Sequence, residues 1–104
     1  GILPLADLLL EAGIDLLYYV DPVQDRLDLA TVRDTFRGRM ALAGGINSGV
    51  TLARGTADEI RQAVHVAMAT LGPRGFILAP VDALFPDTPW ASVEAMIAAW
   101  RELN

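Results

Sequence analysis

The hydrophobic positions of this chain follow two alternating spacings. Apolar residues at helical spacing predict four helices, over residues 4–11, 29–36, 56–71 and 89–100. Short runs rich in β-branched, aromatic and aliphatic residues predict three strands between the helices, over residues 14–20, 39–43 and 75–79. The resulting order is αβαβαβα. This alternation predicts an α/β fold in which the three strands are parallel and are neighbours in sequence order.

Local capping signals mark the starts of three of these helices. Asp28 is a suitable N-cap for the second helix, and Thr56 with Glu59 predicts a capping box at the start of the third. Thr88 is expected to cap the last helix, with Pro89 at its first position. These signals involve only neighbouring residues, so they place the helix starts independently of the rest of the fold.

Each predicted strand ends at a turn signal. Asp21–Pro22 closes the first strand, Gly44–Gly45 the second and Pro80 the third. The loops that follow the strands cover residues 21–25, 44–49 and 80–87. Because ligands of parallel α/β folds bind at the carboxyl ends of the strands, we expect any functional site on these three loops.

The loop after the second strand carries candidate ligand-binding residues. Gly44 and Gly45 allow backbone N–H groups to approach a phosphate or carboxylate, and Asn47 and Ser48 add side-chain donors. The alternative is that both glycines only turn the chain or leave room for packing. The sequence is not a P-loop, since no Gly-Lys-Ser/Thr follows.

Two aspartates follow the ends of the other strands. Asp82 follows the third strand among apolar neighbours, so we expect it to be hydrogen-bonded, protonated or bound to a metal ion, and it is the candidate catalytic residue. Asp21 is a weaker candidate for substrate binding, because Asp-Pro is itself an ordinary turn signal. Either aspartate could instead only stabilise a backbone turn.

Composition and charge exclude several classes of protein. The chain is 53% hydrophobic with a formal charge of −5 and no cysteine, which excludes intrinsic disorder, a disulfide framework and a thiolate nucleophile. Eight basic residues against thirteen acidic ones leave no basic stripe for nucleic acid. No apolar run approaches the roughly 18 residues of a membrane span, and no signal-peptide pattern is present, so we expect a cytoplasmic protein.

Three single residues have ordinary structural interpretations. His65 is the only histidine and lies away from the apolar stripe of its predicted helix, without a second ligand at metal-binding spacing. We therefore expect it on the surface. Trp90 and Trp100 fall on the last predicted helix, and both are expected to pack against the core.

The motifs taken together resemble the uroporphyrinogen decarboxylase family, which includes corrinoid-dependent methyltransferases. The resemblance is carried by Ala-Leu-Ala-Gly-Gly-Ile-Asn at 41–47, Arg-Gly-Thr-Ala-Asp-Glu-Ile at 54–60 and Pro-Asp-Thr-Pro at 86–89. It implies that residues 1–104 form one α/β unit, the last three βα units of a (β/α)8 TIM barrel. It also implies that the parent enzyme decarboxylates a tetrapyrrole or transfers a methyl group linked to a corrinoid, with zinc or a corrinoid protein as the associated cofactor or partner.

The departures from the family pattern bear on the candidate site. Relatives that are decarboxylases show Gly-Asn-Leu-Asp-Pro where this chain has Gly-Gly-Ile-Asn-Ser at 44–48. Asp82 stands where the decarboxylases carry a histidine and the zinc methyltransferases a cysteine. An aspartate there is a hard oxygen ligand, so a metal at Asp82 would differ from a thiolate-rich zinc site.

The chain begins at Gly1, not Met, and we interpret it as a C-terminal fragment that is inactive alone. Both edges of a three-stranded parallel sheet expose unpaired backbone groups, so we expect it to form a homo-oligomer through an exposed edge. In the parent, the partners would be a small-molecule substrate or a corrinoid protein, with neither nucleic acid nor membrane. The alternatives are a fragment of a phosphate-ligand barrel enzyme that uses Gly44–Gly45, and a small non-enzymatic α/β assembly module.

Overall fold

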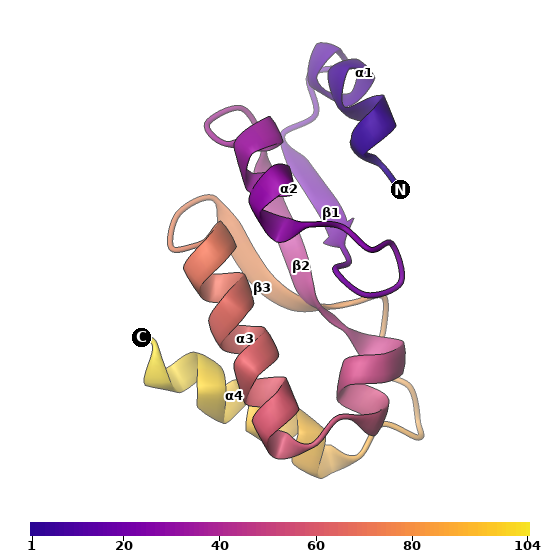
Figure 1. Ribbon diagram of the computed structural model, residues 1–104, viewed down its shortest axis with the longest axis vertical. Coiled ribbons are helices and arrows are strands. Elements are labelled where there is room, and N and C mark those ends of the chain that lie inside the picture. The colour runs from indigo at the N-terminus through magenta and orange to yellow at the C-terminus, as the bar shows by residue number, and fades with distance from the viewer.

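Three strands alternate with four helices in the computed structural model, which describes residues 1–104 (Figure 1). The strands are β1 Leu16–Val20, β2 Ala41–Asn47 and β3 Phe76–Val81. The helices are α1 Ala6–Glu11, α2 Leu29–Phe36, α3 Ala57–Leu71 and α4 Trp90–Glu102. A short 3-10 helix, Leu3–Leu5, precedes α1, and a π-helical segment, Ser48–Leu52, follows β2. The order αβαβαβα predicted from the sequence is confirmed.

The strands form one parallel sheet in the order β1-β2-β3. β2 and β3 pair without interruption from Leu42 opposite Phe76 to Asn47 opposite Val81. The pairing of β1 with β2 shifts register between Leu17 and Val20. All three strands therefore run in the same direction as neighbours in sequence order, as the alternation of elements predicted.

The caps of α2 and α3 confirm the starts expected from the sequence. The Asp28 carboxylate accepts a hydrogen bond from the Thr31 backbone N–H at 3.0 Å. In the capping box, Thr56 Oγ1 accepts from the Glu59 N–H at 3.1 Å, and the Glu59 carboxylate accepts from the Thr56 N–H at 3.0 Å. These contacts satisfy helix N–H groups that have no intrahelical partner.

The start of α4 differs from the expectation. Pro89 occupies the N-cap position, and no side chain caps the helix. The Thr88 hydroxyl instead accepts a hydrogen bond from the Phe85 N–H at 3.2 Å, while the Thr88 N–H donates to the Phe85 carbonyl at 2.9 Å. Thr88 therefore closes the turn before the helix, because its side chain reaches back to the loop and not forward to the helix N–H groups.

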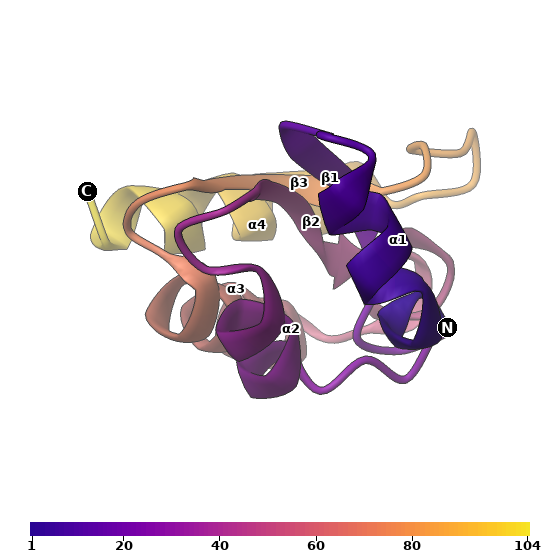
Figure 2. The ribbon, with the colours of Figure 1, turned by 90° about the horizontal axis from the view of Figure 1, so that it is seen from above.

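The hydrophobic core lies between the sheet and the layer formed by α2 and α3, which lie on the same side of the sheet (Figure 2). Its fully buried side chains include Phe36 from α2, Ile46 from β2 and Val64 from α3. No helix covers the opposite face of the sheet, and Leu16, Tyr18 and Ile77, which alternate with core residues along β1 and β3, are exposed there. We call this side the open face of the sheet.

The second and third strands extend beyond the ends expected from the sequence. β2 continues through Gly44 and Gly45 to Asn47, and Pro80 pairs within β3 opposite Ile46. A Cβ at Gly44 would lie 2.8 Å from the Val20 backbone nitrogen, so glycine allows β1 and β2 to approach closely and does not turn the chain here. Pro80 is tolerated because β3 is an edge strand.

The last helix packs only partly against the rest of the protein. Trp90 is 68% exposed and Trp100 is 42% exposed, so the expectation that both tryptophans pack in the core is wrong. α4 contacts α3 beyond the free edge of β3. Ile97 and Trp100 of its apolar stripe remain exposed. His65 lies on α3 with its Nε2 3.3 Å from the Glu102 carboxylate on α4.

No helix of the chain combines the length and the apolar character needed to cross a membrane.

Candidate functional site

The strand ends bring the sequence-predicted polar residues to one edge of the sheet. Asp21 directly follows β1, Asn47 ends β2 and Asp82 directly follows β3. Because the strands are parallel and Asn47 pairs opposite Val81, these three residues lie along the same edge. We call this edge, comprising residues 19–21, 47–48 and 81–82, the carboxyl edge.

The side chains of Asp21 and Asn47 are bonded to each other within the protein. Asp21 is 0% exposed and Asn47 is 1% exposed, and the Asn47 amide nitrogen lies 3.2 and 3.1 Å from the two carboxylate oxygens. One of these oxygens also accepts hydrogen bonds from the backbone N–H groups of Val23, at 2.9 Å, and Gln24, at 3.1 Å. A buried carboxylate that accepts several N–H donors is compensated for its desolvation. The pair therefore ties the loop after β1 to the end of β2.

Asn47 and Ser48 also make hydrogen bonds to the segment after β2 and to the end of β3. The side-chain oxygen of Asn47, Oδ1, accepts hydrogen bonds from the backbone N–H groups of Val50, at 2.6 Å, and Thr51, at 3.4 Å, and so caps the π-helical segment. The buried Ser48 hydroxyl donates to the Val81 carbonyl at the end of β3. No buried side-chain polar atom is left without a partner, so the interior of the carboxyl edge is a satisfied network.

Asp82 lies outside this network. Its side chain is exposed and makes no hydrogen bond within the chain, so the expectation that its apolar neighbours enclose it and force a hydrogen bond is wrong. The backbone at Asp82 is left-handed, with φ +70°, and the apolar residues that follow, Leu84 and Phe85, are themselves exposed. The left-handed turn carries the carboxylate to the rim, where water solvates it and no burial has to be compensated.

Tyr19 is a further residue of this edge that the sequence analysis did not select as a site residue. It has φ +81° inside β1, a conformation rare for an aromatic residue, where the register of β1 against β2 shifts. Partial burial raises the pKa of the Tyr19 phenol, and the carboxylates of Asp82, Asp21 and Asp25 raise it further. The phenol therefore keeps its proton at neutral pH and can donate a hydrogen bond beside Asp82.

The two predicted ligand-binding glycines have mainly packing contacts. A Cβ at Gly44 would meet the Val20 backbone, and one at Gly45 would lie 3.1 Å from both the Ala67 and the Phe76 side chains. The alternative interpretation of these glycines, that they leave room for packing, therefore accounts for both positions. Gly45 also borders a cavity on the helix side of the sheet.

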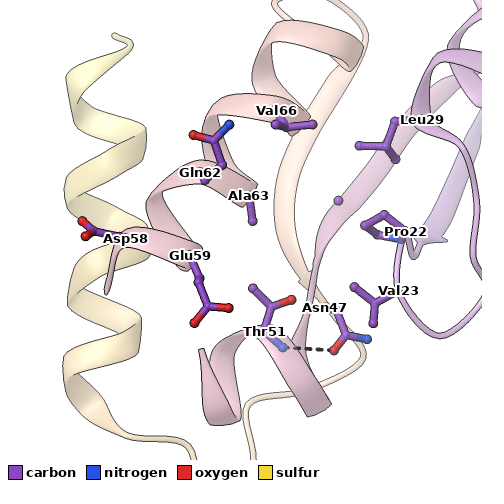
Figure 3. Close-up of a pocket in the computed structure, with 11 residues that line it drawn as sticks. Pro22, Val23, Leu29, Asn47, Thr51, Asp58, Glu59, Gln62, Ala63 and Val66 are labelled. Atoms are coloured by element: carbon purple, nitrogen blue, oxygen red, sulfur yellow. Dashed lines mark hydrogen bonds between the residues drawn. The ribbon is translucent and has the colours of Figure 1, made fainter. Parts of the chain in front are cut away.

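This cavity has a volume of about 510 Å³ and opens beside the carboxyl edge (Figure 3). Gln62, Ala63 and Val66 of α3 line one side, and Pro22 and Val23 of the loop after β1 lie across from them. The rest of its lining comprises Leu29, Gly45, Asn47, Thr51, Asp58 and Glu59. The cavity is mainly apolar with an acidic rim. The hydrogen bonds from Thr56 hold the pKa of the Glu59 carboxyl below its usual value.

The residues present do not fit a zinc site. The chain contains no group of three His, Cys, Asp or Glu side chains placed to hold a metal ion. Asp82 has no neighbouring ligand, and His65 is engaged with Glu102 between α3 and α4. Zinc takes three or four protein ligands, usually nitrogen or sulfur, so Asp82 alone is insufficient.

The comparisons with known proteins concern the chain as a whole. The family model described as Uroporphyrinogen decarboxylase (URO-D) matches residues 2–103. A comparison with curated proteins found no match. The family match covers all three strands and all four helices, including the carboxyl edge. The chain therefore belongs to the uroporphyrinogen decarboxylase family.

Proposed function

We propose that this chain forms the last three βα units of a (β/α)8 barrel enzyme that decarboxylates a tetrapyrrole carrying carboxylate side chains. The observation that carries the proposal is the match of the uroporphyrinogen decarboxylase family over residues 2–103, together with the parallel order of the strands. Residues 1–104 are one α/β unit of that barrel.

The open face of the sheet supports the barrel proposal. In a barrel, one face of the sheet contacts the outer helices and the other contacts side chains of the interior. Leu16, Tyr18 and Ile77 are exposed on the open face, where the interior of a closed barrel would bury them. The free edges of β1 and β3 would pair with the flanking strands, which removes the exposed backbone groups.

The Asp82 carboxylate at the carboxyl edge favours decarboxylation over corrinoid-linked methyl transfer. At the position where the zinc methyltransferases carry a cysteine this chain has Asp82, a hard oxygen ligand in place of a thiolate. A tetrapyrrole substrate presents pyrrole N–H donors, and the Asp82 carboxylate has free acceptor oxygens at the rim. We assign Asp82 as the substrate-contacting residue, while Asp21 and Asn47 position the edge from within.

The proposal is tested by assaying both activities on the whole polypeptide that contains this chain. Uroporphyrinogen is supplied in one assay, and loss of carboxyl groups is followed by mass spectrometry of the oxidised porphyrins. Methylcobalamin and a thiol are supplied in the other, and thioether formation is followed. We expect decarboxylation without methyl transfer, and no activity from residues 1–104 alone. Methyl transfer without decarboxylation, or decarboxylation by residues 1–104 alone, would contradict the proposal.

The isolated chain is expected to self-associate, because the same open face and strand edges then lack their barrel neighbours. A stable contact between two copies would bury on the order of 1,000 Å² or more in total. Light scattering at increasing concentration should therefore report a mass above that of the 11.2 kDa monomer. A monomer at every concentration would show that the free edges need no partner.

A further inference from the structure

A second, smaller cavity lies at the amino edge of the sheet, opposite the carboxyl edge. It has a volume of about 50 Å³. Three arginines line it, Arg33 and Arg37 from the end of α2 and Arg74 from the turn before β3. Gly38 and Gly75, which precede β2 and β3, complete its polar wall. None of these residues belongs to the site described above.

The charge at this cavity is largely uncompensated. Three of the eight basic residues of a chain with a net charge of −5 gather around it. Arg33 pairs with the Asp34 carboxylate at 2.8 Å, and the pKa of that carboxyl is lowered mainly by Arg33 and further by Arg37. Arg37 and Arg74 have no carboxylate within ion-pair distance. Two guanidinium groups therefore keep all their donors available.

The backbone of the two glycines leaves the cavity accessible. Gly38 has φ +76° and Gly75 has φ +68°, and no atom lies within 4 Å of the position a Cβ would take at either residue. The N–H groups of both glycines make no hydrogen bond to the rest of the chain. An anion can thus approach the backbone as well as the guanidinium groups, in the manner of other anion-binding turns.

We propose that this cavity binds a single oxyanion of the phosphate class, held mainly by Arg37 and Arg74. Its volume exceeds the roughly 10–15 Å³ that one water molecule needs but is far below the roughly 300 Å³ of a site for a larger ligand, so it accommodates one small tetrahedral group. A phosphate group carries about −1.5 to −2 charges at neutral pH, which matches two unpaired guanidinium groups. The planar guanidinium fork suits phosphate oxygens, and a carboxylate would neutralise only half of this charge.

The proposal is tested by titrating the purified protein with inorganic phosphate at low ionic strength. Arginine Nε–H signals are followed by NMR, and heat release is measured in parallel. We expect saturable binding of one phosphate per chain, weakened about tenfold or more in Arg37→Gln and in Arg74→Gln, since each loses charge-assisted hydrogen bonds. Arg101→Gln, which removes the same charge from α4, is the matched control and should bind as the unaltered protein does.

Further titrations separate this site from general attraction and from other anions. Methyl phosphate should bind like inorganic phosphate if the site takes the phosphate group of a larger ligand, and acetate should bind more weakly than either. Raising the ionic strength from 0.01 M to 0.15 M shortens the screening length from about 30 Å to about 8 Å and should weaken binding. Absence of saturable phosphate binding, equal weakening by Arg101→Gln, or acetate binding as tight as phosphate would overturn the proposal.

Discussion

Replacing Gly44 by alanine tests how the carboxyl edge is assembled. Gly44 has φ +126°, and its Cβ would lie 2.8 Å from the Val20 nitrogen and 2.9 Å from the Val20 oxygen. Both atoms belong to the backbone, so neither can rotate away. Relief requires β1 to move away from β2, and β1 leads directly into Asp21.

The magnitude follows from two separable contributions. An unfavourable positive φ costs about 1–3 kcal/mol for a residue with a Cβ. The overlap with backbone atoms adds about 1–3 kcal/mol, as overpacking generally does. Gly13→Ala is the matched control, because Gly13 has φ +74° but no atom within 4 Å of its Cβ position. The change in unfolded-state entropy is the same in both variants and cancels in the comparison.

Urea unfolding followed by circular dichroism measures both variants against the unaltered chain. The free energy of unfolding is obtained by linear extrapolation. We expect Gly44→Ala to lose at least about 1 kcal/mol more than Gly13→Ala. If Gly44→Ala no longer unfolds in a cooperative transition while Gly13→Ala still does, this would likewise show that Gly44→Ala is the more destabilised variant. Equal destabilisation of the two variants would show that the contact between Gly44 and Val20 does not constrain the sheet.

Three other substitutions have defined outcomes. Phe36→Ala removes a fully buried ring and should cost about 3–5 kcal/mol in the same unfolding experiment; a cost below 1 kcal/mol would contradict its place in the core. Thr56→Ala removes the helix cap and should cost about 1 kcal/mol at neutral pH. The pKa of Glu59 is lowered mainly by the Thr56 backbone N–H, which the alanine variant keeps, and further by the Thr56 side chain, which it loses. This stabilisation is present above the unfolded-state pKa and is lost as the pH falls through the folded-state pKa, so the cost of Thr56→Ala should shrink slightly in acid and not grow. Asp82→Asn should lower the pKa of Tyr19 in an NMR titration, but not to its ordinary value, because the burial that also raises this pKa remains. An unchanged pKa would show that the Asp82 charge does not act on the Tyr19 phenol.

The helix starts and the order of the strands could be predicted from the sequence. The starts of α2 and α3 followed from Asp28 and from Thr56 with Glu59, because a cap acts within one helical turn. The parallel order of the strands followed from the alternation of strand and helix. The convergence of Asp21 and Asn47 at one edge is a consequence of that order.

The features that the sequence could not predict depend on contacts between distant segments. Gly44 and Gly45 resemble a turn until the backbone of β1 is in place beside them. Asp82 has apolar neighbours along the chain, but its exposure is decided by a left-handed backbone and by a loop that turns outward. The positive φ of Tyr19 arises where β1 shifts register against β2, and the residue types at this point do not predict such a shift.

The carboxyl edge is the proposed point of contact with substrate, and one pair of variants tests this most directly. Asp82→Asn keeps the shape of the side chain and removes its charge, while Asp87→Asn makes the same change at another exposed position of the loop that joins β3 to α4. Steady-state decarboxylation of uroporphyrinogen is measured for both in the whole polypeptide, with unfolding free energies as the control for folding. We expect Asp82→Asn to reduce kcat/KM about tenfold or more at unchanged stability, since it weakens a charge-assisted hydrogen bond, and Asp87→Asn to leave kcat/KM unchanged. Equal activity of the two variants would contradict substrate contact at Asp82.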